Sequence, residues 1–302
     1  MVPLCRWRAG GTIAGRLGAR KPALGTGRAL IAAPGFGWLL PVLLALIGAV
    51  VGSFAGAAAI RIGRGESVVT GRSRCDGCGR TLSIIDLVPI LSFTALRGRC
   101  RTCGSRIDRL QPAAEILGAG IGLGAWLAMA SPAQAVVAAL LGWQLLVLGL
   151  SDWRAFHLLP TGIALLAVSA AILPLLAIAH DLPAETLVLR QLAGGGLGYV
   201  LLAAPALAFR AIRGRDGMGS ADPPLMGAAG LWVGPTGVCF ILLLAAVLGI
   251  GLALLSMVRG NAGSGPDNSL RSDDSAGALP LGTMISVATI AVTFAGFSLL
   301  TP

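Results

Sequence analysis

The stretch Cys75-Asp-Gly-Cys78, followed after 21 residues by Cys100-Arg-Thr-Cys103, decides what kind of membrane protein this chain forms. Each C-x2-C pair can form a tight knuckle, and two knuckles can supply the four thiolates of a tetrahedral zinc site. Both pairs lie in residues 61–110, which hold ten arginines and four acidic residues. Such an excess of arginine predicts a cytoplasmic loop, and the reducing cytoplasm favours a metal over disulfides. The sequence therefore predicts a cytoplasmic zinc-binding domain over residues 61–110.

Outside this segment the chain of 302 residues is strongly apolar. It is 55% hydrophobic and only 12% charged, with a mean hydropathy of +0.83, which excludes an ordinary soluble domain. Apolar stretches long enough to cross about 30 Å of hydrocarbon lie at residues 38–60, 111–131, 134–151, 158–179, 191–212, 236–256 and 280–300. The shorter apolar piece 224–234 is either a half-helix or the start of an eighth span. We therefore expect an all-α polytopic membrane protein with seven to eight transmembrane helices, the first over residues 38–60.

The net charge of +10 comes almost entirely from arginines in loops. We interpret this charge as a topology signal and as contact with lipid headgroups, and not as a nucleic-acid-binding surface. Residues 1–37, with six basic residues and no acid, are predicted to be a basic flexible tail, and residues 257–279, rich in Gly, Ser, Asn and Asp, a flexible loop. A cytoplasmic 61–110 loop would place the basic tail outside, a conflict that a mis-assigned start would remove.

Carboxylates at or inside the apolar segments are rare. Only Glu115, Asp152 and Asp222, of 13 acidic residues, lie there, and an acid at membrane depth is costly unless it is paired or hydrated. Two complete crossings separate Asp152 from Asp222, so both return to the membrane face that carries residues 61–110. The loop His180–Leu189 between these crossings has two acids and no arginine, as expected on the outer face.

A pair of carboxylates at this face could hydrolyse a peptide bond. Two close acids in a poorly hydrated site cannot both ionise cheaply, so one is held protonated. The ionised acid can take a proton from water while the neutral acid donates to the substrate carbonyl. Simpler interpretations remain open: Asp152 could form an interfacial ion pair with Arg154, and Asp222, before two prolines, could be a helix N-cap. The chain has neither H-E-x-x-H nor G-x-S-x-G.

The residues around the cysteine pairs resemble the N-terminal region of bacterial prepilin peptidases. The resemblance rests on Gly52-Ser-Phe54, Arg61-Ile-Gly-Arg-Gly-Glu-Ser67, Arg72-Ser-Arg-Cys75-Asp-Gly-Cys78, Asp86-Leu-Val-Pro-Ile-Leu-Ser92, Leu96-Arg-Gly-Arg-Cys100-Arg-Thr-Cys103 and Pro112-Ala-Ala-Glu115. The second half of the chain is similar more loosely, through Asp152, Gly217-Met-Gly-Ser-Ala-Asp222, Gly227–Gly234 and Leu279-Pro-Leu-Gly282.

The resemblance implies an aspartic endopeptidase of the bacterial inner membrane that removes the basic leader from type IV prepilins or from the pseudopilins of type II secretion. Cleavage would fall on the cytoplasmic side, before an apolar helix of the substrate. Members with the four-cysteine domain commonly also methylate the new N-terminal amine with S-adenosylmethionine. The family's catalytic aspartates carry over to Asp152 and Asp222, its structural zinc ligands to Cys75, Cys78, Cys100 and Cys103, and its peptidase domain to residues 111–302.

Some positions differ from the usual pattern of that family. The second motif usually reads Gly-x-Gly-Asp with a lysine two residues later, whereas here Ala221 precedes the acid and Pro224 takes the place of the lysine. Ala221 restricts the backbone, and Pro224 removes a charge that could lower the pKa of a carboxyl group. Pro160-Thr161 replaces the usual Pro-Asp or Pro-Asn after the first aspartate. These changes bear on efficiency, substrate choice and methyl transfer.

Two functions of other classes remain open from the sequence. A catalytically degenerate membrane scaffold of a pilus or secretion system would account for the altered motif before Asp222. A transporter could use both aspartates in a proton relay, although the zinc loop would then have no obvious purpose. For the peptidase, we expect Glu66, Asp76 and Asp86 to contact the basic leader of the substrate.

Overall fold

The computed structural model describes residues 37–68, 72–260 and 280–295. Residues 1–36 of the predicted tail 1–37 and residues 261–279 of the predicted loop 257–279 lie outside the described residues. Within them every regular element is a helix, and the only extended pairs are the isolated bridges Arg74–Thr81 and Arg99–Arg106. The helices are α1 (Leu39–Gly63), η2 (Ile84–Leu87), α2 (Leu91–Ala95), α3 (Leu110–Ala128), α4 (Pro132–Ala155), α5 (Pro160–Ser169), α6 (Ile172–Ala179), α7 (Ala184–Arg213), α8 (Asp222–Gly260) and α9 (Leu281–Phe294).

The predicted all-α polytopic fold is confirmed. Five of the described stretches are long and apolar enough to cross a membrane: α1, α4, α5 with α6, α7, and the part of α8 that ends at Leu255. The predicted span 111–131 is helix α3, which is only 19 residues long and carries Gln111 and Glu115 near its start. Helix α9 is a shorter apolar helix of 14 residues. Large apolar side chains are exposed along α1, α5, α7 and α8, as lipid-facing surfaces require.

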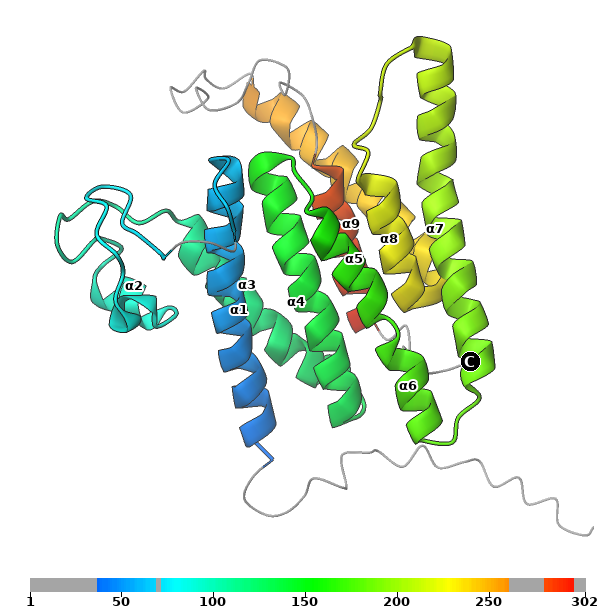
Figure 1. The fold of residues 1–302 in the computed structure, drawn as a ribbon, viewed down its shortest axis with the longest axis horizontal. Helices are drawn as coiled ribbons and strands as arrows, with labels where there is room; N and C mark the ends of the chain where they lie inside the picture. The colour runs from blue at the N-terminus through cyan, green and yellow to red at the C-terminus, as the bar shows by residue number, and fades with distance from the viewer. Residues whose placement is uncertain (1–36, 69–71, 261–279, 296–302) are drawn as a thin grey trace, which may run out of the picture.

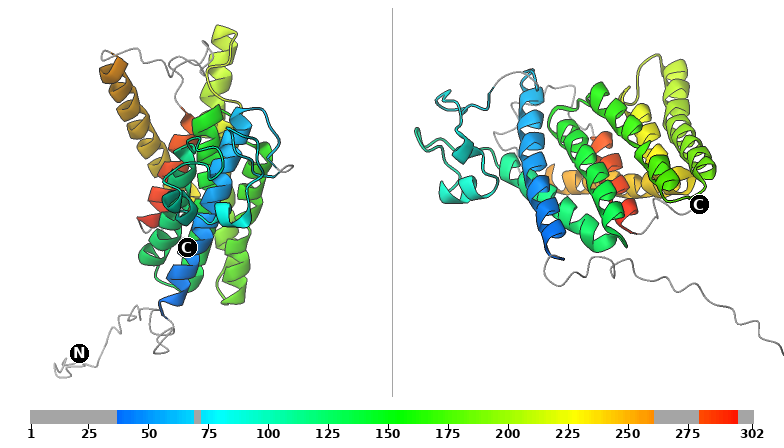
Figure 2. Two further views of the ribbon diagram at one scale, coloured as in Figure 1. Left: turned by 90° about the vertical axis from the view of Figure 1, so that its left-hand side faces the viewer. Right: turned by 60° about the horizontal axis from the view of Figure 1, so that its bottom comes forward.

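Helix α8 is broken at Gly234. This residue has φ 74° and ψ −179°, outside the helical range, and Pro235 follows it. The predicted apolar piece 224–234 is therefore the first half of a broken helix. Figures 1 and 2 show that the two halves form a V, with both ends of α8 directed toward the same end of the molecule.

Glycines bring the helices into close contact. A Cβ atom at Gly48 or Gly52 of α1 would overlap backbone atoms of α3, and one at Gly194 or Gly198 of α7 would overlap backbone atoms of α8. Small residues at these positions let helices approach closely where no hydrophobic effect drives them together. Polar side chains inside the bundle have partners: the indole N–H of Trp232, for example, donates to the carbonyl of Leu166 over 2.9 Å.

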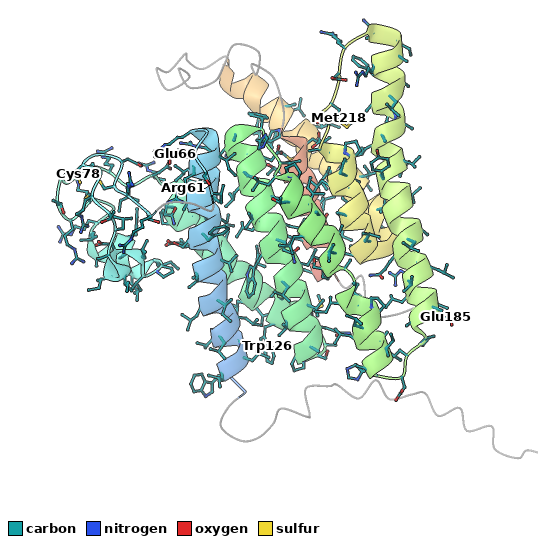
Figure 3. The ribbon with its side chains drawn as sticks, viewed as in Figure 1. Arg61, Glu66, Cys78, Trp126, Glu185 and Met218 are labelled. Carbon is teal, nitrogen blue, oxygen red and sulfur yellow. The ribbon has the colours of Figure 1, made fainter. Side chains whose placement is uncertain are left out.

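The helix ends that carry the candidate site lie together. The C-terminal end of α4 and the first turns of α8 and α9 are at the same end of the bundle, and the segment with the cysteine pairs projects to the side of α1 (Figure 1). In Figure 3, Arg61 and Met218 lie toward this end, whereas Glu185 and Trp126 lie toward the opposite one.

Candidate active site and metal centre

Asp152 is a buried carboxylate held by the start of α9. It lies in the last turn of α4, which ends at Ala155 and is capped by Phe156 in the left-handed conformation, and it is 6% exposed. Its Oδ2 accepts a hydrogen bond from the backbone N–H of Thr283 over 2.8 Å, and the Thr283 hydroxyl lies 3.2 Å from the same oxygen. That hydroxyl is also 2.9 Å from the carbonyl of Gly149, so its single proton is shared. A Cβ at Gly282 would press on this carboxylate.

Asp222 is an equally buried carboxylate, but it lies at the N-terminal end of its helix, whereas Asp152 lies at a C-terminal end. It is the first residue of α8 and is also 6% exposed. Its Oδ2 lies so close to Gly219 that a Cβ there would come within 2.8 Å of it. The loop 214–221 thus returns the chain from α7 and seats this side chain against a glycine.

The structure brings the two aspartates into one site. Their helix ends lie at the same end of the bundle (Figure 1), and the carboxylates interact electrostatically with each other. The simpler roles do not hold. Arg154 pairs with Asp108 over 3.1 Å and not with Asp152. An N-cap role for Asp222 lacks donors, because Pro223 and Pro224 have no N–H and the next N–H, of Leu225, donates to the carbonyl of Ala221.

Glu115, the third acid in the apolar segments, has a different place. Its carboxylate accepts the backbone N–H of Ile90 over 2.7 Å and the side chain of Gln111 over 3.3 Å. Ile90 has φ 62°, an uncommon conformation for a β-branched residue. Glu115 therefore fastens α3 to the segment between the cysteine pairs and is not part of the aspartate site.

The four paired cysteines form one cluster. Their Sγ atoms all lie within 4.8 Å of one another, and Cys75 Sγ is 3.7 Å from Cys103 Sγ. A tetrahedron with Zn–S bonds of about 2.3 Å has edges of about 3.8 Å, so the spacing fits a four-thiolate zinc site. A hydrogen bond with Ser105 is the main reason that the pKa of the Cys75 thiol is lowered to about 6, which favours the thiolate that metals bind.

The two knuckles repeat one backbone pattern. The N–H of Cys75 donates to the carbonyl of Arg80, and the N–H of Cys100 donates to that of Ser105. Each loop ends in a glycine with positive φ, Gly79 at 69° and Gly104 at 72°, where a side chain would be strained. The spacing C-x2-C-G therefore encodes the turn as well as the ligands.

The acids expected to meet a basic leader are mostly engaged within the chain. Asp76 pairs with Arg64 over 2.7 Å. Asp86 accepts hydrogen bonds from the N–H and hydroxyl of Ser83, which together with Arg80 hold the pKa of its carboxyl group below the ordinary value. The third acid of that hypothesis, Glu66, is exposed, and its charge acts on the guanidinium of Arg64.

Sequence reasoning missed Thr283. A hydroxyl in the first turn of an apolar helix belongs to no catalytic motif, and its contact with Asp152 joins residues 131 positions apart. The available signal is the preceding stretch Leu279-Pro-Leu-Gly282, which resembles the prepilin peptidases and ends directly before Thr283.

Fold and site together define a helical membrane protein with a buried pair of aspartates and a four-cysteine loop. The family model described as the bacterial peptidase A24 N-terminal domain matches residues 46–129, and the model described as the type IV leader peptidase family matches residues 139–254. The chain belongs to the type IV leader peptidase family.

Relatives named prepilin leader peptidase/N-methyltransferase occur in several bacteria. One from Burkholderia pseudomallei (strain 1026b) is 33% identical over 63% of this chain and 59% of its own length. One from Pseudomonas putida is 30% identical over 72% of this chain and 69% of its own length. One from Bacillus subtilis (strain 168) is 30% identical over 64% of this chain and 73% of its own length. The chain thus spans about six tenths of the Burkholderia relative. No solved structure matches it.

Proposed function

We propose that this chain is an aspartic endopeptidase of the bacterial inner membrane that removes the basic leader from type IV prepilins or type II pseudopilins. The observation that carries the proposal is the burial of Asp152 and Asp222 in one site at one end of the helix bundle. Membership of the type IV leader peptidase family supports it, as does the name shared by the relatives. Residues 61–110 would be its zinc-binding domain and residues 111–302 its peptidase domain.

The hydrogen bonds suggest how the two acids divide the work. Asp152 receives two donors from Thr283, which favour a carboxylate, so Asp152 takes a proton from the attacking water. The resulting hydroxide adds to the scissile carbonyl carbon, and Asp222 gives its proton to the carbonyl oxygen. When the C–N bond breaks, the proton that Asp152 took passes to the leaving amine. Asp222 recovers its proton as the tetrahedral intermediate collapses.

We further propose that Cys75, Cys78, Cys100 and Cys103 hold a structural zinc ion. Four thiolates fill its coordination sphere and leave no position for a reacting water. The zinc would therefore close the two knuckles and take no part in hydrolysis.

The name of the relatives also supports N-methylation of the new N-terminus with S-adenosylmethionine. A cavity of about 1020 Å³ lies among the end of α1, the start of α3 and the cysteine segment, where Glu66 and Arg72 are among its polar walls. It has room for a cofactor of this size. The cofactor would supply the methyl group to the amine.

Processing of a prepilin by the purified protein tests the peptidase. Leader removal should be abolished in both Asp152→Ala and Asp222→Ala. Asp181→Ala is the matched control, because Asp181 is an exposed acid in the loop at the opposite end of the bundle. This variant should remove the leader at the normal rate. Processing that persists in either aspartate variant contradicts the two-acid mechanism. A total lack of processing by the unchanged protein would favour the degenerate scaffold.

A further inference from the structure

An apolar groove of about 450 Å³ lies beside the first half of α8, and its lining begins close in sequence to both aspartates. Helices α5, α7 and α8 form its walls, and all eleven of its lining residues are Gly, Ala, Pro, Ile or Leu. Pro160, Gly196 and Pro224 are exposed, so the groove is open to the surroundings of the bundle.

The groove adjoins the proposed catalytic pair. Its nearest wall residue on α8 is Pro224, two positions after Asp222, and its farthest on that helix is Leu231. At 1.5 Å per residue this wall is about 10 Å long. The α5 wall begins at Pro160, the first residue of the helix that follows Asp152. A chain cut at the aspartates could therefore continue directly into the groove.

The chemistry of the walls specifies the occupant. In hydrocarbon a bound segment must satisfy its own backbone polar groups, which requires a helix. The exposed small residues Gly196 on one side and Ala164 on the other let a helix backbone come close. A polar side chain would find no hydrogen-bond partner among these walls, so the segment must be apolar for about two turns.

We infer that this groove docks an apolar helical segment of the substrate, immediately on one side of the cut bond. The inference rests on the proposed peptidase function and deepens it. Docking fixes the depth of the substrate in the membrane and so brings one peptide bond to Asp152 and Asp222. A lipid acyl chain is the competing occupant, but it has no reason to be aligned with the two acids.

Gly196→Leu tests the inference with little disturbance of the fold. Gly196 lines the groove and a Cβ there meets no atom within 4 Å, so a leucine at this position adds bulk to the groove wall without a clash inside the protein. Gly120→Leu is the matched control, because Gly120 is an exposed helical glycine on α3 with the same free space and lies outside the groove. Both changes raise helix propensity alike.

Two substrates separate docking from chemistry. One is an intact prepilin in phospholipid vesicles, and the other is a soluble peptide that covers the leader and ends soon after the cut bond. Gly196→Leu should lower kcat/KM for the intact substrate by about tenfold or more, mainly through KM, and leave the soluble peptide unchanged. Equal cleavage of the intact substrate by Gly196→Leu and the unchanged protein would overturn the inference, and so would an equal loss on both substrates.

Photocrosslinking keeps this result separate from the peptidase proposal. A photoreactive leucine placed one turn after the cut bond of the intact substrate should attach to α5, α7 or α8, also in Asp152→Asn. Attachment only to α1 or α3 would refute docking in the groove. Attachment to the groove without cleavage by the unchanged protein would uphold docking and refute the peptidase.

Discussion

At the scale of single residues, the two aspartates differ in their surroundings more than in their burial. Asp152 is gripped by the N–H and hydroxyl of Thr283 at the start of α9, whereas Asp222 rests against Gly219. A pair of acids must be unequal to act as base and acid, because only one of them can hold the shared proton. The inequality here comes from one threonine.

Thr283→Val should slow leader removal by at least about tenfold, because a hydrogen bond to a charged acceptor contributes about 1.5–3 kcal/mol and each step of about 1.4 kcal/mol is a factor of ten in rate. The change keeps the backbone N–H and the volume of the side chain. Thr283→Ser restores the hydroxyl and should recover most of the rate, which a purely structural role of the threonine methyl group would not allow. Single-turnover cleavage of a prepilin measures the effect. Equal rates in Thr283→Val and Thr283→Ser would show that the Thr283 hydroxyl does not contribute to catalysis.

Asp86→Asn should destabilise the cysteine segment at neutral pH. The carboxyl group of Asp86 is only 4% exposed, and its folded pKa lies below the ordinary value of about 4. Its ionised form therefore contributes stability above about pH 4, and this contribution is lost as the pH falls through the folded pKa. The difference from the unchanged protein should be full at pH 7 and shrink below about pH 4.

Hydrogen exchange over residues 72–109 measures this difference at each pH. Asp76→Asn is the control, because Asp76 and Arg64 form an exposed ion pair of little expected value. If the difference in hydrogen exchange between Asp86→Asn and the unchanged protein stays constant down to pH 3, the ionised Asp86 carboxylate is not the source of the stability.

At the scale of elements, α1 packs on α3 and α7 packs on α8 through glycine contacts, whereas large buried side chains such as Leu145 of α4 and Leu166 of α5 form the core of the bundle. Gly118 of α3 lies against the backbone of α1 at Gly48, and its carbonyl accepts the indole N–H of Trp143 over 3.0 Å. One residue thus positions three helices.

Gly118→Leu should separate α1 from α3 and lower the free energy of unfolding by at least about 2 kcal/mol, since the added side chain meets backbone atoms that cannot give way. Gly120→Leu, two residues away on the exposed side of α3, should leave that free energy nearly unchanged. Thermal unfolding of the two variants in the same detergent makes the comparison. Equal stability would show that α3 can shift without cost.

The knuckles could be predicted from sequence because both ligands and turn glycine lie within five residues. The meeting of Asp152 and Asp222 at one end followed from counting crossings. The course of α8 could not be predicted, because Gly234-Pro235 indicates a break but not the direction in which the chain leaves it. The grip of Thr283 on Asp152 was equally hidden, since it depends on how α9 packs against α4 and no local pattern records that packing.

At the scale of the whole molecule, the polar chemistry is gathered toward one end, but in two separate places. The cysteine segment projects beside α1, while the aspartates lie among α4, α8 and α9 (Figures 1 and 2). Glu115 and the Arg154–Asp108 ion pair fasten the cysteine segment to the bundle. Loss of the metal should therefore disturb the cysteine segment much more than the aspartate site.

Cys78→Ser should abolish zinc retention, because three thiolates and a hydroxyl bind the ion far more weakly than four thiolates. Elemental analysis of the purified protein measures the metal, and limited trypsin digestion should then cut at the arginines of residues 72–109. Cys239→Ser, a change outside the cluster, should keep the metal and the protection. Full zinc content in Cys78→Ser would refute the four-cysteine assignment, and unchanged cleavage of a soluble leader peptide is expected in both variants.

The break at Gly234 has a mechanical consequence. Because Pro235 offers no N–H, the helical ladder is interrupted there, and the first half of α8 is a short rod separate from the half that follows. Asp222 stands at the start of this rod, whereas Asp152 is anchored to α9. The rod is wedged into the bundle, because residues 225–230 are all buried and its backbone lies against Gly194 and Gly198 of α7. The position of Asp222 is therefore decided by how this short half packs on α7 and not by the direction of the longer half of α8 after the break.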